Sequence, residues 1–122
     1  TRLAIEALSA TEGVRYMGVS VLTLLPVTPA GAATAFFLNS TVLREVDRDH
    51  SGALKLLQAS QLDWTLVACG QIVDGHGGAT LQRGDRFTWA GYRKIEAGDV
   101  AREIWQEIST PEHHRTVFGA WA

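Results

Sequence analysis

The chain has 122 residues, of which 46% are hydrophobic and 20% are charged. This composition fits one compact globular domain spanning residues 1–122. The net charge of -2 leaves no basic excess to neutralise a phosphate backbone, which argues against a nucleic-acid partner. No apolar run approaches the roughly 18 residues of a membrane-spanning helix. The single cysteine, Cys69, excludes a disulfide framework and a cysteine-based zinc site within a monomer and favours the cytoplasm.

The first part of the chain predicts a helix followed by a strand. Apolar residues recur at helical spacing over residues 3–8, and Gly13 follows as a stop. Residues 14–22 (VRYMGVSVL) are almost wholly apolar and β-branched, which is typical of a strand covered on both faces. The chain has no initiator Met and its first residues have the pattern of a helix interior. We therefore expect either a fragment, a processed chain or further residues upstream.

The remainder alternates between helical and extended patterns. The expected elements, in chain order, are a helix over 32–43, a charged stretch leading into a helix that ends near Ser60, a buried strand over 66–69, a glycine-rich loop over 70–78, one or two short strands within 80–89, a helix capped by Asp99, and an edge strand over 115–120.

This order predicts an α/β fold. Two buried strands joined by a helical crossover imply a parallel sheet with a right-handed connection. Such a sheet needs helices on both faces, and the chain supplies few of them. We therefore expect the apolar faces of the sheet to be buried either against something that this sequence does not contain or against a second copy of the chain. The expected partner is thus another copy of the chain, in a homo-oligomer.

Several segments resemble one known family. Residues 59–75 (ASQLDWTLVACGQIVDG) are similar to the pattern A-S-G-L-D-W-T-I-V-R-P-G-x-L-x-D-G of atypical short-chain dehydrogenase/reductases, the NAD(P)H-binding NmrA-like and biliverdin/flavin reductase-like proteins. Asp49 and His50, with the helix through Leu57, resemble the family's D-H-x-x-x-E-x-L-L stretch, and IEAGDV (95–100) resembles I-S-R-A-D-V-A. The resemblance implies a Rossmann-like, three-layer α/β/α fold.

The chain departs from the family at two places. Family members begin with a strand and G-x-x-G-x-x-G, which holds the cofactor pyrophosphate, and this sequence has no such run. Ala68, Cys69 and Gly70 stand where the family has R-P-G. We therefore expect the C-terminal half only, an incomplete Rossmann-like sheet lacking the N-terminal dinucleotide-binding half. NAD(P)H is implied for the complete family domain, without tight binding by this chain alone.

Three residues are candidates for the catalytic site. Ser20 and Thr23 lie at the C-terminal end of the first strand, the edge where α/β sheets bind ligands. His50 lies in the crossover helix, where relatives with a Y-x-x-x-K pair keep their proton donor, and histidine exchanges protons near neutral pH. Lys55 follows at a spacing of five, which does not place it on the same helix face. The alternative for Ser20 and Thr23 is that their hydroxyls only bond the nearby backbone. The alternative for His50 is that it forms a solvated surface pair with the preceding aspartate.

The resemblance places Gly70, Gln71, Ile72 and Val73 beside the nicotinamide ring, where Gly70 allows close approach and Ile72 gives an apolar contact. The alternative is an ordinary turn between strand and loop. The remaining candidate metal ligands lack the spacing of a zinc site and are expected to be surface residues, so no metal is predicted. They are Asp74, His76, His113 and His114.

Two functions follow from these patterns. The first is an NAD(P)H-dependent reductase, in which this chain provides the substrate side for hydride transfer to a carbonyl, flavin or enone small molecule. The second is a non-catalytic remnant of the same fold that acts through self-association or partner binding. Fold alone does not decide between them.

Overall fold

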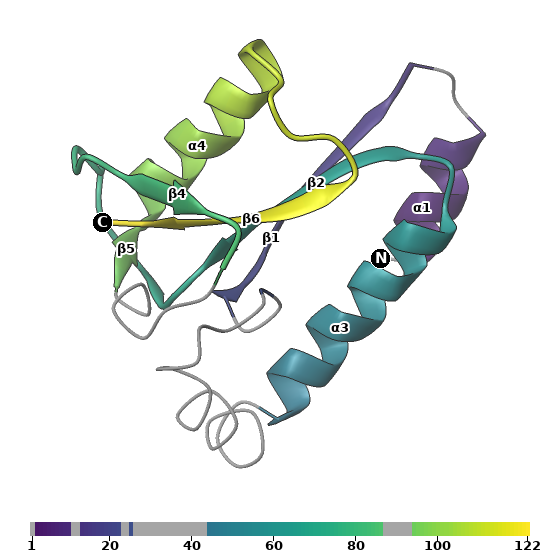
Figure 1. Cartoon of the computed structure of the whole chain (residues 1–122), viewed down its shortest axis with the longest axis horizontal. Helices are drawn as coiled ribbons and strands as arrows, with labels where there is room; N and C mark the ends of the chain where they lie inside the picture. The colour runs from purple at the N-terminus through teal and green to yellow at the C-terminus, as the bar shows by residue number, and fades with distance from the viewer. Residues whose placement is uncertain (1, 11–12, 23–24, 26–43, 87–93) are drawn as a thin grey trace.

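A mixed four-stranded sheet forms the centre of the molecule (Figure 1). The computed structural model describes residues 2–10, 13–22, 25, 44–86 and 94–122. The sheet has the order β1-β2-β6-β4, and a second sheet pairs β3 with β5. The strands are β1 (Arg15–Val21), β2 (Asp63–Cys69), β3 (Ile72–Val73), β4 (Gln82–Gly84), β5 (Ile95–Glu96) and β6 (Thr116–Trp121).

The strand directions correct two expectations. β1, β2 and β6 are mutually parallel, as the α/β order predicts, but β4 pairs antiparallel with β6. The predicted fold class, an incomplete parallel sheet, is therefore wrong in this respect. The prediction that β6 is an edge strand is also wrong, because β4 continues the sheet on its outer side.

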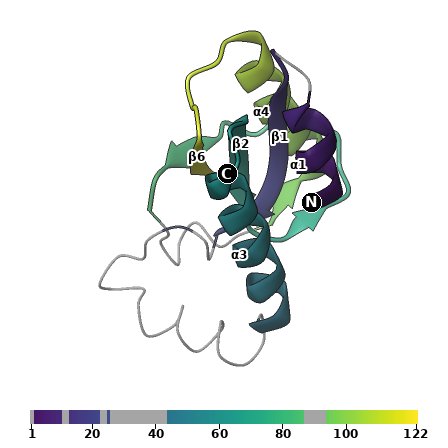
Figure 2. The ribbon, with the colours of Figure 1, turned by 90° about the vertical axis from the view of Figure 1, so that its right-hand side faces the viewer.

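Three helices cover the two faces of the sheet in the described part of the chain. They are α1 (Arg2–Ser9), α3 (Arg44–Ala59) and α4 (Ala97–Ser109). Side chains of β2 alternate between the faces, so Trp64 and Leu66 pack with Ile5 of α1 and Leu57 of α3. Val67 of β2 packs with Val100 on the α4 side. Figures 1 and 2 show α1 lying beside α3, and the layers are therefore α/β/α.

Local patterns place most elements correctly, but β3 lies within the segment 70–78 that the sequence predicts as loop, and two further corrections follow. β1 is only partly covered: Tyr16 packs on the α1 and α3 side and Met17 on the α4 side, but Val19 is 37% exposed and Ser20 is the only fully buried residue of the strand. Asp99 is not the N-cap of α4: Glu96 occupies that position, and Asp99 lies inside the first turn. The expected helix over 32–43 and the end of the 80–89 segment lie outside the described residues. None of the described helices combines the length and apolar character needed to cross a membrane.

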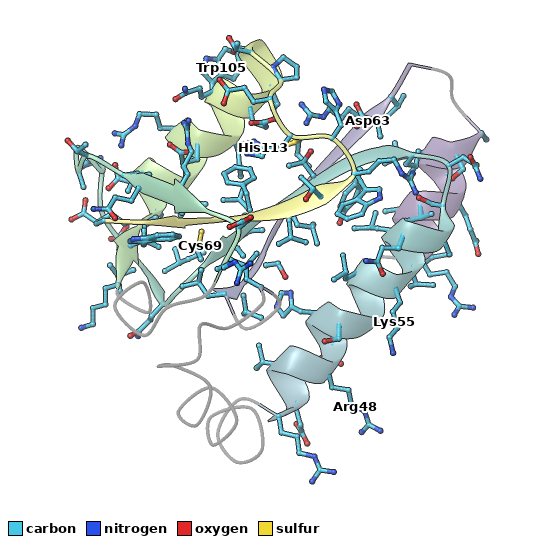
Figure 3. The ribbon with its side chains drawn as sticks, viewed as in Figure 1. Arg48, Lys55, Asp63, Cys69, Trp105 and His113 are labelled. Carbon is cyan, nitrogen blue, oxygen red and sulfur yellow. The ribbon has the colours of Figure 1, made fainter. Side chains whose placement is uncertain are left out.

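An ionic network closes the edge of the sheet where β1 and β2 begin. Arg15 bonds Thr65 (Nη2 to Oγ1, 2.6 Å) and the carboxylate of Glu107 in α4 (Nη2 to Oε1, 3.1 Å), and also the carbonyl of His113. The His113 ring lies 3.0 Å from the second oxygen of Glu107 and stacks on Phe118 with ring centroids 4.1 Å apart. Figure 3 shows His113 between α4 and the sheet, whereas Trp105 projects outward and is 70% exposed. The network ties α4 to β1 and β2.

Two glycines with open surroundings should respond to alanine in opposite ways. Gly52 lies inside α3, and an added Cβ would meet no other atom within 4 Å, so Gly52→Ala should raise the free energy of unfolding by about 0.5 to 1 kcal/mol through helix propensity. Gly13 is equally open but has φ +73°, so Gly13→Ala should lower it by about 1 kcal/mol. Urea unfolding of both variants measures the difference. Equal shifts in the two would contradict the assigned backbone conformations.

Candidate functional site

The C-terminal ends of β1 and β2 bring the predicted site segments to one edge of the sheet. The parallel register sets Ser20 beside Ala68 and Val21 beside Cys69. The turn that begins at Gly70 therefore leaves the sheet next to the end of β1. This is the edge at which parallel α/β sheets bind ligands.

Ser20 and His50 are in hydrogen-bond contact at this edge. The Ser20 Oγ lies 3.1 Å from His50 Nδ1, although 30 residues separate them in the chain. Ser20 is 4% exposed, and the half-buried His50 reaches it from α3, the helix that connects β1 to β2. A hydroxyl can accept a hydrogen bond and donate its own proton at the same time. The pair can therefore carry a proton from the imidazole towards a ligand oxygen.

Lys55, which the sequence does not place on the same helix face as His50, does not join this contact. Thr23 lies outside the described residues. Lys55 is exposed and projects from α3 away from the sheet (Figure 3). Of the described candidates, Ser20 and His50 are the ones that the fold brings together.

The turn after β2 is bonded to the segment that precedes α4. Ile72 and Val73 form β3 and pair with Ile95 and Glu96 of β5, and the backbone N–H of Ile95 donates to the carbonyl of Gln71 at 2.9 Å. Ile72 is 45% exposed. The turn therefore presents apolar surface at the C-terminal edge of the parallel strands, on a backbone that is held in place.

Cys69 ends β2 near the same edge and is almost fully buried. Burial raises the pKa of its thiol to about 12, and the negative charge of Glu103 adds to the increase. The reactive form of cysteine is the thiolate. Cys69 is therefore a core residue and not a nucleophile.

The candidate metal ligands are distributed over separate places. Asp74 and His76 are exposed in the glycine-rich loop, while His113 is bonded to Glu107 and His114 to Asp63 at the opposite edge. Within the described ranges, no three His, Cys, Asp or Glu side chains are grouped so that they could hold a metal ion.

A cavity of about 390 Å³ also lies away from the Ser20–His50 pair. It is lined by residues at the start of β1 and β2, including Arg15 and Asp63. These two charged groups already lie 3.5 Å apart as an ion pair. Because its charged groups are paired with each other, this cavity is a weaker candidate for chemistry than the Ser20–His50 edge.

Sequence reasoning did not find two carboxylates that contact the glycine-rich loop. Glu96 accepts a hydrogen bond from the N–H of Gly77, and Asp99 accepts one from the N–H of Gly78, each at 2.8 Å. About twenty residues separate each donor from its acceptor. The only signal in the sequence is a glycine run that precedes no helix, which fits a backbone that another segment approaches closely.

Comparison with known proteins identifies the family. A model of the family described as NAD(P)H-binding matches residues 1–111. ChuY, an anaerobillin reductase from Escherichia coli O157:H7, matches with a TM-score of 0.76 at 21% sequence identity. The match covers 98% of this chain and 55% of the ChuY chain. A short-chain dehydrogenase/reductase from Veillonella parvula DSM 2008, in complex with NADP, has a TM-score of 0.73 at 18% identity, covering 99% and 56%. No curated protein matches significantly.

These matches confirm that the chain is related to NAD(P)H-binding proteins, and they correct the prediction of which part of such a protein it is. The chain spans little more than half the length of the two solved proteins. The prediction of a C-terminal half that lacks the N-terminal dinucleotide-binding part is wrong, because the match to the NAD(P)H-binding model begins at residue 1. That prediction relied on the missing glycine motif, on first residues with the pattern of a helix interior and on the resemblance of the later segments, whereas the family model matches residues 1–111. The chain belongs to the NAD(P)H-binding family, and its fold is similar to those of ChuY and of the Veillonella parvula short-chain dehydrogenase/reductase.

Proposed function

We propose that this chain provides the acceptor side of an NAD(P)H-dependent reductase that passes hydride to a carbonyl, flavin or enone. The contact between the buried Ser20 hydroxyl and His50 is the observation that carries the proposal. It lies at the ligand-binding edge of a chain that belongs to an NAD(P)H-binding family. The fold shared with ChuY, an anaerobillin reductase, gives further support.

Ser20 has the role of a hydrogen-bond donor to the acceptor atom. With His50 Nδ1–H donating to the Ser20 oxygen, the serine proton is free to point at a substrate oxygen or nitrogen. A donor at that position stabilises the negative charge that develops as hydride arrives. Ser20 then gives its proton to the acceptor, His50 Nδ1–H replaces that proton, and the other ring nitrogen of His50 takes up a proton from solvent.

The turn from Gly70 to Val73 fits the nicotinamide end of the cofactor. A nicotinamide ring needs apolar surface, and Ile72 is a large apolar residue that remains 45% exposed beside this edge. The bound cofactor supplies the hydride. The turn would orient the ring and exclude water from one of its faces.

A titration and an acceptor screen test the proposal. The purified protein is titrated with NADPH and NADH, and loss of nicotinamide absorbance is then followed with a free flavin, a dicarbonyl and an enone. We expect saturable but weak binding, and cofactor oxidation that depends on one acceptor class. Absence of binding up to about 1 mM, equivalent to roughly 4 kcal/mol, would contradict the proposal. Binding without oxidation of any acceptor would favour the non-catalytic alternative.

A further inference from the structure

The glycine-rich loop is bonded by its backbone to the start of α4. Beyond the pairing of β3 with β5, the N–H of Gly98 donates to the carbonyl of Gly75 at 3.0 Å. Residues 71–79 therefore continue from β2 as a strap that lies against residues 95–99. The exposed Ile72 is part of this strap.

Two carboxylates fix the far end of the strap. Glu96 Oε2 accepts from Gly77 N–H, and Asp99 Oδ1 accepts from Gly78 N–H, each at 2.8 Å. Arg102 pairs with the same Asp99 oxygen at 2.7 Å and donates to the carbonyl of Ala79 at 2.6 Å. Three consecutive residues of the loop are thus held by side chains of one short segment.

The properties of Asp99 agree with this role. Asp99 is 2% exposed, although it carries a charge. Its pKa is lowered by the hydrogen bond from Gly78, against the effect of burial, with further contributions from Arg102 and Ala79. Gly77 has φ +81°, and a Cβ there would lie 2.7 Å from the Asp99 backbone nitrogen and from its Oδ1. The glycine run therefore permits a close approach between the loop and the helix. This packing explains the glycines without a role in phosphate binding.

We propose that Glu96 and Asp99 are positioning residues that hold the strap, and with it the Ile72 surface, in the place where the nicotinamide ring binds. This inference rests on the proposed function of the Gly70 to Val73 turn. Neither carboxylate touches the reacting atoms. Their loss should weaken binding of the cofactor much more than it slows the chemical step.

Three variants and a control test the proposal. Glu96→Ala removes one acceptor, Glu96→Gln keeps an acceptor oxygen without the charge, and Asp99→Asn does the same at the second position. Glu6→Ala removes an exposed carboxylate of α1, which lies outside the strap. Hydrogen exchange of the Gly77 and Gly78 amides is measured by NMR, together with the KM for NAD(P)H and kcat. Thermal unfolding identifies any variant that has lost its fold.

A hydrogen bond to a charged group corresponds to about a tenfold effect or somewhat more. We therefore expect Glu96→Ala to speed Gly77 exchange and to raise the KM for the cofactor by about tenfold each, with kcat within about twofold. Glu96→Gln should restore most of both, and Asp99→Asn should speed exchange chiefly at Gly78. Glu6→Ala should change nothing.

Two results would overturn the inference. Unchanged exchange in Glu96→Ala and Asp99→Asn would show that the carboxylates do not hold the loop. Faster exchange with an unchanged KM would show that they hold it for structure only. Failure of the unmodified protein to bind NAD(P)H would instead refute the proposed function and the positioning of the ring with it, while the exchange rates would still decide whether the strap is held as described.

Discussion

Ser20→Ala should lower turnover about 100-fold while leaving the affinity for NAD(P)H unchanged. The Ser20 hydroxyl is buried at the edge where we propose that the acceptor binds, and with His50 Nδ1–H as the donor its own proton is free for that acceptor. Removal of one preorganised donor to developing negative charge typically costs about 3 kcal/mol, which is the origin of the expected factor. Steady-state kinetics with the acceptor class found for the unmodified protein, together with a cofactor titration, measures both quantities.

Matched variants separate this role from a general loss of structure. Ser60→Ala removes a hydroxyl beyond the end of α3 that donates to the Leu57 carbonyl at 2.7 Å and accepts from the Leu62 N–H at 3.3 Å, and should retain full turnover. His50→Ala should lose at most tenfold, because solvent can replace a proton relay more easily than a direct donor. Thr23→Ala tests the second hydroxyl that the sequence predicts as a candidate for the catalytic site. Full activity in Ser20→Ala, His50→Ala and Thr23→Ala would mean that hydride transfer here needs no side-chain acid.

The sequence predicts each half of the Ser20–His50 pair but not the pairing. β-branched periodicity places Ser20 at the end of a strand, and the helical pattern through Leu57 places His50 near the start of the crossover helix. Their contact depends on the position of α3 along the length of β1, and packing between the two elements sets that position. No local pattern in the sequence encodes it.

Long-range pairing explains most of the incorrect predictions as well. Asp99 has the residue type of an N-cap, but its carboxylate bonds the loop at Gly78 and α4 begins two residues earlier. β6 has the pattern of an edge strand and becomes interior because β4, a three-residue strand, pairs with it. In both cases a partner about twenty or more residues away overrides the local preference.

Glu107 at the opposite edge of the sheet should have the largest effect on stability. Its carboxylate is 6% exposed and accepts hydrogen bonds from Arg15, from the backbone N–H of Glu112 and from the backbone N–H of His113. Burial by itself raises the pKa of this group. The bonds from the His113 side chain and backbone, with those of Glu112 and Arg15, outweigh burial and lower the pKa to about 2 from the ordinary 4.5.

This lowered pKa makes the folded state sensitive to acid. A group whose pKa is lower in the folded than in the unfolded state contributes full stability above its unfolded pKa and loses it as the pH falls through the folded one. For Glu107 the loss should run from about pH 4.5 down to about pH 2. The difference between the two pKa values corresponds to about 3 kcal/mol. Arg15 is not left without a charged partner in a Glu107 variant, because Asp63 lies 3.5 Å from it.

Glu107→Gln should therefore lower the free energy of unfolding at neutral pH by about 3 kcal/mol and flatten its decline in acid. Urea unfolding at a series of pH values between 2 and 7 gives both results. Glu112→Gln is the matched control, because its side chain is exposed on the same turn and only its backbone joins the network. Asp99 also has a lowered pKa, so some acid sensitivity should persist in every variant. If Glu107→Gln and the unmodified protein lose stability in parallel below pH 4.5, the ionic network at the start of β1 and β2 does not fasten α4 to the sheet.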